Sequence, residues 1–96
     1  MPTHAETARF RRDFKKLAPH QRMAFRSAVR KFLADLPSRR FRSGLRVKLV
    51  QGTDGIFEMT WADDGRVTFQ YGPEVIEGQT QVIWRRVGTH SIPANP

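Results

Sequence analysis

The chain has 96 residues, no cysteine and a formal net charge of +8 at pH 7. This length predicts one domain over residues 1–96 with one modest core, and the lack of cysteine excludes disulfides and thiolate metal sites. The segment Met1–Glu6 is polar, and no apolar run is long enough to cross a bilayer. We therefore expect a cytoplasmic protein with neither a secretory signal nor a membrane span.

The charge is divided unevenly along the chain. The first 50 residues carry 14 Lys and Arg against 3 Asp and Glu, whereas the other 46 carry 3 against 6. Such a basic half favours a polyanionic partner, namely nucleic acid, a ribosome, an acidic protein or an anionic membrane surface. A basic surface that serves only solubility is the alternative.

The basic half has the apolar spacing of two helices. Phe10, Phe14 and Leu17 recur at i, i+4 and i+7, which predicts a short amphipathic helix. It could begin at Thr7, or earlier through a capping box from Thr3 to Glu6.

Pro19 suits the first turn of a second helix, and Leu36-Pro37-Ser38 ends it. The apolar stripe of this helix comprises Phe25, Ala28, Val29, Phe32 and Leu36. A turn this short between two helices predicts an antiparallel helical hairpin.

After a basic connector over residues 37–44, the apolar period becomes two. Strands are predicted at 45–50, 56–61, 66–71 and 81–87, with Asp64-Gly65 suiting a tight hairpin turn. The simplest arrangement is an antiparallel meander. The predicted fold class is therefore α+β, a two-helix hairpin packed on a twisted four-stranded antiparallel sheet.

The alternation along these strands sorts side chains onto two faces of the sheet. One face is apolar and is expected to pack against the helices: Leu45, Val47, Leu49, Phe57, Met59, Trp61, Val67, Phe69, Tyr71, Val82 and Trp84. The other is polar and is expected to be solvated: Arg46, Lys48, Glu58, Thr60, Arg66, Thr68, Gln70 and Arg85. Cations on neighbouring strands repel, so we expect either Glu58 or a bound anion among them.

The order of these elements, with Leu45-Arg-Val-Lys-Leu49, Gly55-Ile-Phe-Glu-Met59 and the ending Trp84-Arg-Arg-Val-Gly-Thr-His90, resembles the RelE/ParE superfamily of bacterial toxins. The ending is similar to that of YafQ-type members. The resemblance implies a microbial-RNase-like fold, with room here for only a very short N-terminal strand. It also implies a cognate acidic antitoxin that binds in a hetero-oligomer, and cleavage of messenger RNA on the 70S ribosome.

The resemblance assigns roles to individual residues. Arg46 and Lys48 match the family's basic pair, His90 matches the C-terminal catalytic histidine, and Asp64 matches an acidic residue of the hairpin. Arg66 and Arg85 are counterparts of the phosphate-binding arginines. Arg86, at the sheet edge, and Arg42, in the connector, are further RNA-binding candidates.

Cleavage of RNA without a metal or cofactor needs a base for the 2′-hydroxyl, cations for the phosphorane and an acid for the leaving oxygen. His90 suits either proton role because an imidazole changes charge between about pH 5 and 8. Glu58 is the candidate second proton carrier, with a structural ion pair as the alternative. His4 and His20 lack ligand spacing, so no metal site is predicted.

Three positions depart from the YafQ type: Thr60 stands where it has a second histidine, Gly65 where it has an aromatic residue, and no aromatic residue follows His90. Two alternatives to a nuclease therefore remain. One is a ParE-like inhibitor of DNA gyrase, and the other is a non-catalytic module that binds RNA or an antitoxin.

Overall fold

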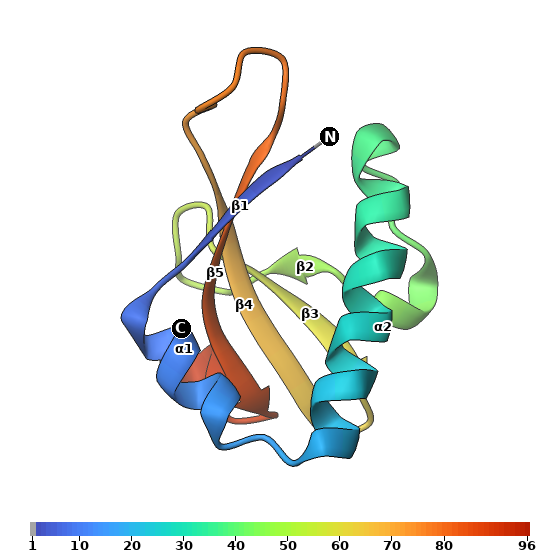
Figure 1. Ribbon diagram of the computed structural model, residues 1–96, viewed down its shortest axis with the longest axis vertical. Coiled ribbons are helices and arrows are strands. Elements are labelled where there is room, and N and C mark those ends of the chain that lie inside the picture. Colours follow the sequence, from blue (N-terminus) through green and yellow to red (C-terminus); the bar gives the residue numbers. More distant parts are fainter. Residues whose placement is uncertain (1) are drawn as a thin grey trace.

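The computed structural model describes residues 2–96, in which two helices cover one face of a five-stranded sheet (Figure 1). The strands run in the order β1-β5-β4-β3-β2 across the sheet. Their bounds are β1 Thr3–Glu6, β2 Lys48–Leu49, β3 Phe57–Ala62, β4 Gly65–Gly72 and β5 Gln81–Thr89. The predicted α+β class and the antiparallel meander from β2 to β5 are confirmed. The very short N-terminal strand is present as β1, but it pairs parallel with β5, so the whole sheet is mixed.

Helix α1 spans Ala8–Lys15 and helix α2 spans Pro19–Asp35. Thr7 is the N-cap of α1, because its hydroxyl accepts a hydrogen bond from the Phe10 N–H at 3.0 Å. The same hydroxyl donates to the Arg85 carbonyl at 2.6 Å and so fastens the helix to β5. The capping box from Thr3 to Glu6 is wrong, since those residues form β1. No helix within residues 2–96 is long and apolar enough to cross a membrane.

The core lies between the helices and the sheet and is largely aromatic. Phe32 packs against Phe69 and Trp84, with ring centroids 5.0 and 5.5 Å apart. Phe25 makes edge contacts with Trp61 and Trp84. Both tryptophans are buried, as the alternation predicts. They are therefore core residues.

The predicted strand at residues 45–50 is wrong in most of its length. A 3-10 turn occupies Ser43–Leu45, and Arg46 has a left-handed backbone with φ of 47°. Only Lys48 and Leu49 pair with β3. Leu49 points to solvent, with 50% of its surface exposed, and Val50 is buried instead. Leu45 is buried and Val47 packs against the core as predicted, so the difference in burial is confined to Leu49 and Val50.

The helices do not form a closed hairpin. Phe14 and Phe25 meet edge to face near the connection, at 6.1 Å between ring centroids. Beyond that contact α1 and α2 diverge, with α1 at the lower left and α2 on the right of Figure 1. The space between them is a groove rather than a packed interface.

The expected solvated face of the sheet is partly covered by the chain's own C-terminal segment. Ile92 begins a 3-10 turn, Ile92–Ala94, and is itself buried. It packs so closely on Gly88 that a Cβ there would lie 2.9 Å from it. Thr68, in the middle of β4, is completely buried on this side, and its hydroxyl has no hydrogen-bond partner within residues 2–96.

A buried ion pair joins α1 to β5. Asp13 accepts two hydrogen bonds from Arg86, each 2.9 Å long, and a third from the Val87 N–H at 3.3 Å. Burial alone would raise the pKa of Asp13, but the hydrogen bonds from Arg86 and Val87 outweigh it, so the pKa lies below the usual 3.8. Arg86, a candidate for RNA binding, is thus engaged in holding the helix to the sheet.

We expect Arg86→Met to lower the free energy of unfolding by about 3 kcal/mol at neutral pH, because it leaves a buried carboxylate without its cation. A carboxyl with a lowered pKa stabilises the fold above its unfolded pKa, and that contribution is lost as the pH falls through the folded value. The difference between variant and wild type should therefore shrink below the usual pKa of 3.8. Urea unfolding at several pH values measures it. A difference that does not change with pH would contradict this account, and Arg12→Met, on the exposed side of α1, is the control.

Candidate functional site

The tip of the β3–β4 hairpin and the end of β5 bring His90 and Asp64 together. Gly65 pairs with Thr89, which places the next residue, His90, beside the turn that contains Asp64. His90 Nδ1 lies 2.5 Å from Asp64 Oδ1. Both side chains are open to solvent, at 72% and 65% exposure. A macromolecular substrate can therefore reach this pair.

The hydrogen bond between His90 and Asp64 has a defined direction. An ionised carboxylate only accepts hydrogen bonds, so His90 Nδ1 is the donor and Nε2 faces away from Asp64. The hydrogen bond from His90 lowers the pKa of Asp64, and the charges of His90 and Arg66 add to that effect. Asp64 thus stays ionised at neutral pH and fixes the imidazole with Nε2 available for proton transfer.

Glu58 lies apart from this pair. It stands opposite Thr68 on β4 and opposite Lys48 on β2, whose Nζ is 3.8 Å from Glu58 Oε1. Thr68 is three positions along β4 from Gly65, which is roughly 10 Å of strand. The structure therefore does not bring His90 and Glu58 together, and the group beside His90 is Asp64.

The two arginines that the resemblance assigns to phosphate binding, Arg66 and Arg85, both donate hydrogen bonds to backbone carbonyl oxygens. The Arg66 Nη1 contacts the carbonyl oxygens of Gly65, Asp63 and Ala62 at 2.9, 3.2 and 3.4 Å, so it braces the hairpin beside Asp64. Arg85 donates to Gln70 Oε1 at 2.5 Å and to the Pro96 carbonyl at 3.2 Å. The C-terminal segment therefore lies where a ligand of Arg85 would lie.

The connector contributes two further candidates. Arg42 forms a double hydrogen bond with Asp35, both contacts being 2.9 Å, which lowers the pKa of Asp35 to about 2. Arg46 is exposed. Together with Lys31 of α2 and Arg66, these two arginines line a cleft of about 660 Å³ between α2, the connector and β3. The sequence did not single out Lys31, because its neighbours in the cleft lie far away in sequence.

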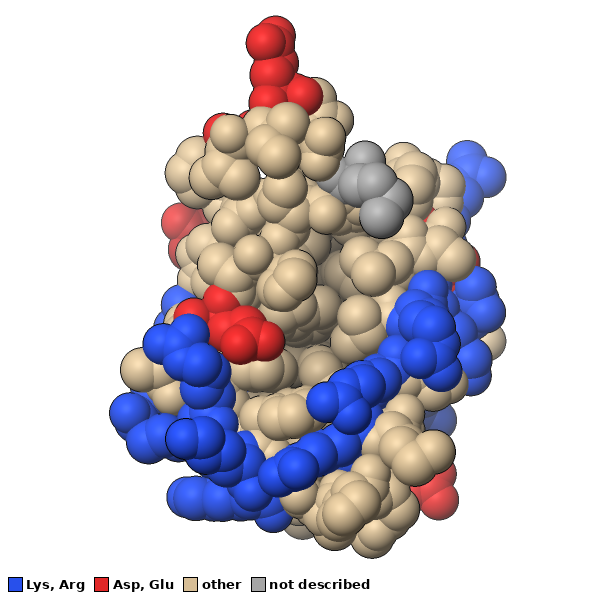
Figure 2. All heavy atoms as spheres, viewed as in Figure 1, with Lys and Arg blue, Asp and Glu red and all other residues tan. Residues whose placement is uncertain are grey.

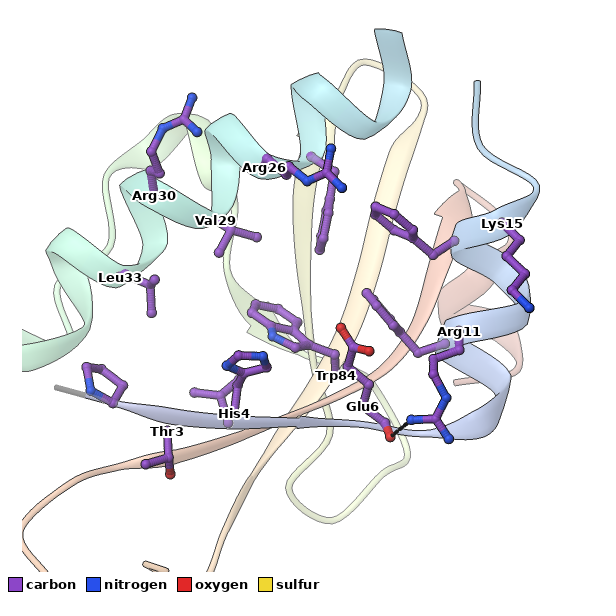
Figure 3. Close-up of a pocket in the computed structure, with 15 residues that line it drawn as sticks. Thr3, His4, Glu6, Arg11, Lys15, Arg26, Val29, Arg30, Leu33 and Trp84 are labelled. Carbon is purple, nitrogen blue, oxygen red and sulfur yellow. Dashed lines mark hydrogen bonds between the residues drawn. The ribbon is translucent and has the colours of Figure 1, made fainter. Parts of the chain in front are cut away.

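A second concavity is the groove between β1, α1 and α2, with a volume of about 580 Å³ (Figure 3). Its inner surface is apolar and includes Phe14, Val29, Leu33 and Trp84. Cations from both helices surround it, namely Arg11, Lys15, Arg26 and Arg30, with Glu6 as the acidic lining residue. Figure 2 shows Lys and Arg atoms along the lower and right sides of this hollow, with acidic atoms at its left side.

The comparisons with known proteins identify the fold. No family model and no curated protein matches the sequence. A chain of the Escherichia coli DinJ–YafQ toxin–antitoxin complex superposes with a TM-score of 0.65 at 13% identity, covering 95% of this chain and 94% of that one. A chain of the Escherichia coli RelBE toxin–antitoxin complex gives 0.61 at 20% identity over 93% and 96%. The YoeB/ParE toxin of Agrobacterium tumefaciens gives 0.65 at 8% identity over 92% and 98%. The chain thus has the fold of the RelE, YafQ and ParE-type toxins over nearly its full length, as the resemblance implies.

The hydrogen bond between His90 and Asp64 can be tested through the pKa of the carboxyl. In His90→Ala the pKa of Asp64 should rise towards the usual 3.8, because the largest cause of its lowering is removed. Carbon-detected NMR titration of the Asp carboxyl groups measures this directly. His4→Ala, on β1, is the matched control and should leave Asp64 unchanged. An Asp64 that titrates identically in the wild type and in His90→Ala would show that the pair does not form in solution.

Proposed function

We propose that the chain is the toxin of a type II toxin–antitoxin pair and an endoribonuclease that cleaves messenger RNA on the ribosome, in the cytoplasm. The observation that carries this proposal is the exposed His90–Asp64 pair at the hairpin of this particular fold. An oriented imidazole open to a large substrate is what proton transfer to or from RNA requires. The solved structures of the same fold include toxins crystallised with antitoxins.

In the proposed reaction His90 Nε2 is the general acid or base at the scissile phosphodiester, and solvent water exchanges the other proton. Asp64 holds the ring in one orientation and stabilises the imidazolium form, as a carboxylate does beside a catalytic histidine. Arg66, fixed on the same hairpin, supplies positive charge next to the pair. Glu58 is too distant from His90 to reach the same phosphodiester group. Its contact with Lys48 gives it the role of relieving charge repulsion on the sheet.

We expect His90→Ala to reduce cleavage of translated messenger RNA by 10²-fold or more, because removal of a positioned acid or base costs about 10²–10⁴ in rate. Asp64→Asn should reduce it less, since the imidazole remains but loses its orientation. Primer extension on cellular RNA after induced expression measures both. Glu58→Gln is the matched control and should cleave like the wild type. Full activity of His90→Ala would exclude the assignment.

The same experiment separates the two alternatives. Growth arrest with intact messenger RNA, together with inhibition of DNA supercoiling, would identify a gyrase inhibitor. Neither arrest nor cleavage would identify a non-catalytic binding module. The threonine at position 60 and the glycine at position 65 favour that module over the nuclease, whereas the His90–Asp64 pair favours the nuclease.

The groove between α1 and α2 is the proposed docking site of the antitoxin. An amphipathic helix could place its apolar stripe on Val29, Leu33 and Trp84 and its acidic side chains against the surrounding cations. Leu33 supports this role because it is a large apolar side chain with 40% of its surface exposed at the groove. The basic rim would also speed the encounter with an acidic partner.

Leu33→Glu should weaken binding of the proposed antitoxin by at least 10-fold, because it puts a carboxylate in the apolar groove. The fold should tolerate the change, since Leu33 is already partly exposed. Isothermal titration calorimetry gives the affinity. Arg12→Glu, which makes a charge change on α1 outside the groove lining, should have a much smaller effect. Equal losses in both variants would show that net charge, and not the groove, governs binding.

A further inference from the structure

The loop between β4 and β5, residues 73–80, is acidic and apolar in an otherwise basic chain. It carries Glu74 and Glu77 and contains no Lys, Arg or His. Val75 and Ile76 lie between these two carboxylates, with 69% and 50% of their surface exposed. Figure 1 shows the loop rising beyond the end of the sheet, and Figure 2 shows acidic atoms at its tip. Neighbouring apolar side chains bordered by charge and held out in solvent are a candidate contact surface.

The loop has a defined conformation of its own. Glu74 Oε1 accepts a hydrogen bond from the Gly78 N–H at 3.1 Å. The Ile76 carbonyl accepts another from the Gln79 N–H at 3.0 Å. Gly78 has φ of 79°, a left-handed conformation that glycine adopts without strain. Because the loop is already ordered, it loses less conformational entropy on binding than a flexible segment would.

The charge of the loop restricts what it can contact. Among residues 2–96, no cation lies within ion-pair distance of Glu74 or Glu77. Nucleic acid and acidic proteins carry the same sign of charge as these carboxylates and would be repelled. The complementary surface is therefore an apolar hollow bordered by cations.

The groove between β1, α1 and α2 has this composition. Its apolar inner surface includes Val29, Leu33 and Trp84, and the cations around it are Arg11, Lys15, Arg26 and Arg30. None of these four cations has a carboxylate within ion-pair distance among residues 2–96. The lining includes no residue of the loop, so the loop of the same molecule does not fill the groove.

We propose that the loop of one molecule docks in the groove of a second copy of this chain. Val75 and Ile76 contact the apolar inner surface, and Glu77 faces the cations of α2. Glu74 is already engaged with the Gly78 N–H and keeps the loop in shape. A loop of eight residues buries less than the roughly 1,600 Å² of a standard interface, so the association is weak and reversible.

This self-association uses the groove assigned above to the antitoxin, so an antitoxin would displace the loop. That consequence alone rests on the proposed function. The pairing of loop and groove is independent of it, because both surfaces belong to the chain itself.

Two variants separate the halves of this contact. Leu33→Glu keeps the loop and blocks the groove, whereas the double variant Val75→Ser/Ile76→Ser keeps the groove and removes the apolar part of the loop. The three side chains are at least 40% exposed, so both variants should fold. In sedimentation velocity over a concentration series the wild type should self-associate, and neither variant alone should do so. The two variants mixed should associate one to one, because the first retains the loop and the second retains the groove.

A charge reversal tests the ionic part of the contact. Glu77→Lys, added to Leu33→Glu, should weaken the mixed association about fivefold, because an exposed ion pair worth up to about 1 kcal/mol is lost. Asp54→Lys in the same background is the matched control. It makes the same change of charge at an exposed position outside the loop and should have little effect.

Four outcomes would overturn the proposal. A monomeric wild type, or a mixture that does not associate, would exclude the contact. Self-association of Val75→Ser/Ile76→Ser alone would place the interface elsewhere on the molecule. Equal weakening by Glu77→Lys and Asp54→Lys would show attraction to net charge only. All four are distinguishable from failure of the proposed function, because the measurement contains no antitoxin, RNA or ribosome.

Discussion

The contact of Asp13 with Arg86 and the Val87 N–H determines how β5 lies in the sheet. The pairing of β4 with β5 shifts between Thr68 and Phe69, so β5 contains one extra residue between Trp84 and Val87. Trp84 and Val87 are three positions apart and would point to opposite faces of a regular strand. Because of this bulge both face the core. A carboxylate buried on the helix side needs a cation and a backbone donor there, and the bulge supplies both.

The bulge in β5 also affects where the residues of the candidate site lie. Since Arg86 turns towards α1, Arg85 is left on the opposite face, with Gln70 and the C-terminal carbonyl. Beyond the bulge, Val87, Gly88 and Thr89 pair regularly with β4, which brings the next residue, His90, to the hairpin turn. The position of the imidazole thus depends on an ion pair formed on the helix side of the sheet. Histidine on an isolated C-terminal segment would have no fixed partner.

The sequence predicted the parts of the fold that have a regular period. Two helices, the meander and the buried face of β3 and β4 follow from spacing alone. Alternation at residues 45–49 misled because Leu45 and Val47 have the spacing of a strand, while the 3-10 turn and the left-handed Arg46 break it. Such a turn leaves no mark in a hydrophobic pattern.

Contacts between distant residues were beyond the sequence for another reason. Asp13 and Arg86 are 73 positions apart, so no local pattern links them. Nothing in the sequence around Ile92 indicates that this residue packs on Gly88. The sequence named His90 and Asp64 as candidate site residues, but it did not predict that the two side chains pair. His90 was identified through the resemblance to the family, and the carboxylate that the structure places beside it is Asp64.

Helix α2 divides the positive charge of this small chain between two sides of the molecule. Arg26, Val29, Arg30 and Leu33 recur at helical spacing and line the groove. Ala24, Ser27, Ala28 and Lys31 follow the same spacing on another side and line the cleft. The two sets share no residue, so charge on one side of the helix can change without altering the lining of the other. A partner held in the groove would therefore leave the cleft cations in place. The basic half of the chain is thus divided by helix geometry into an apolar groove with a charged rim and a polar cleft beside the hairpin.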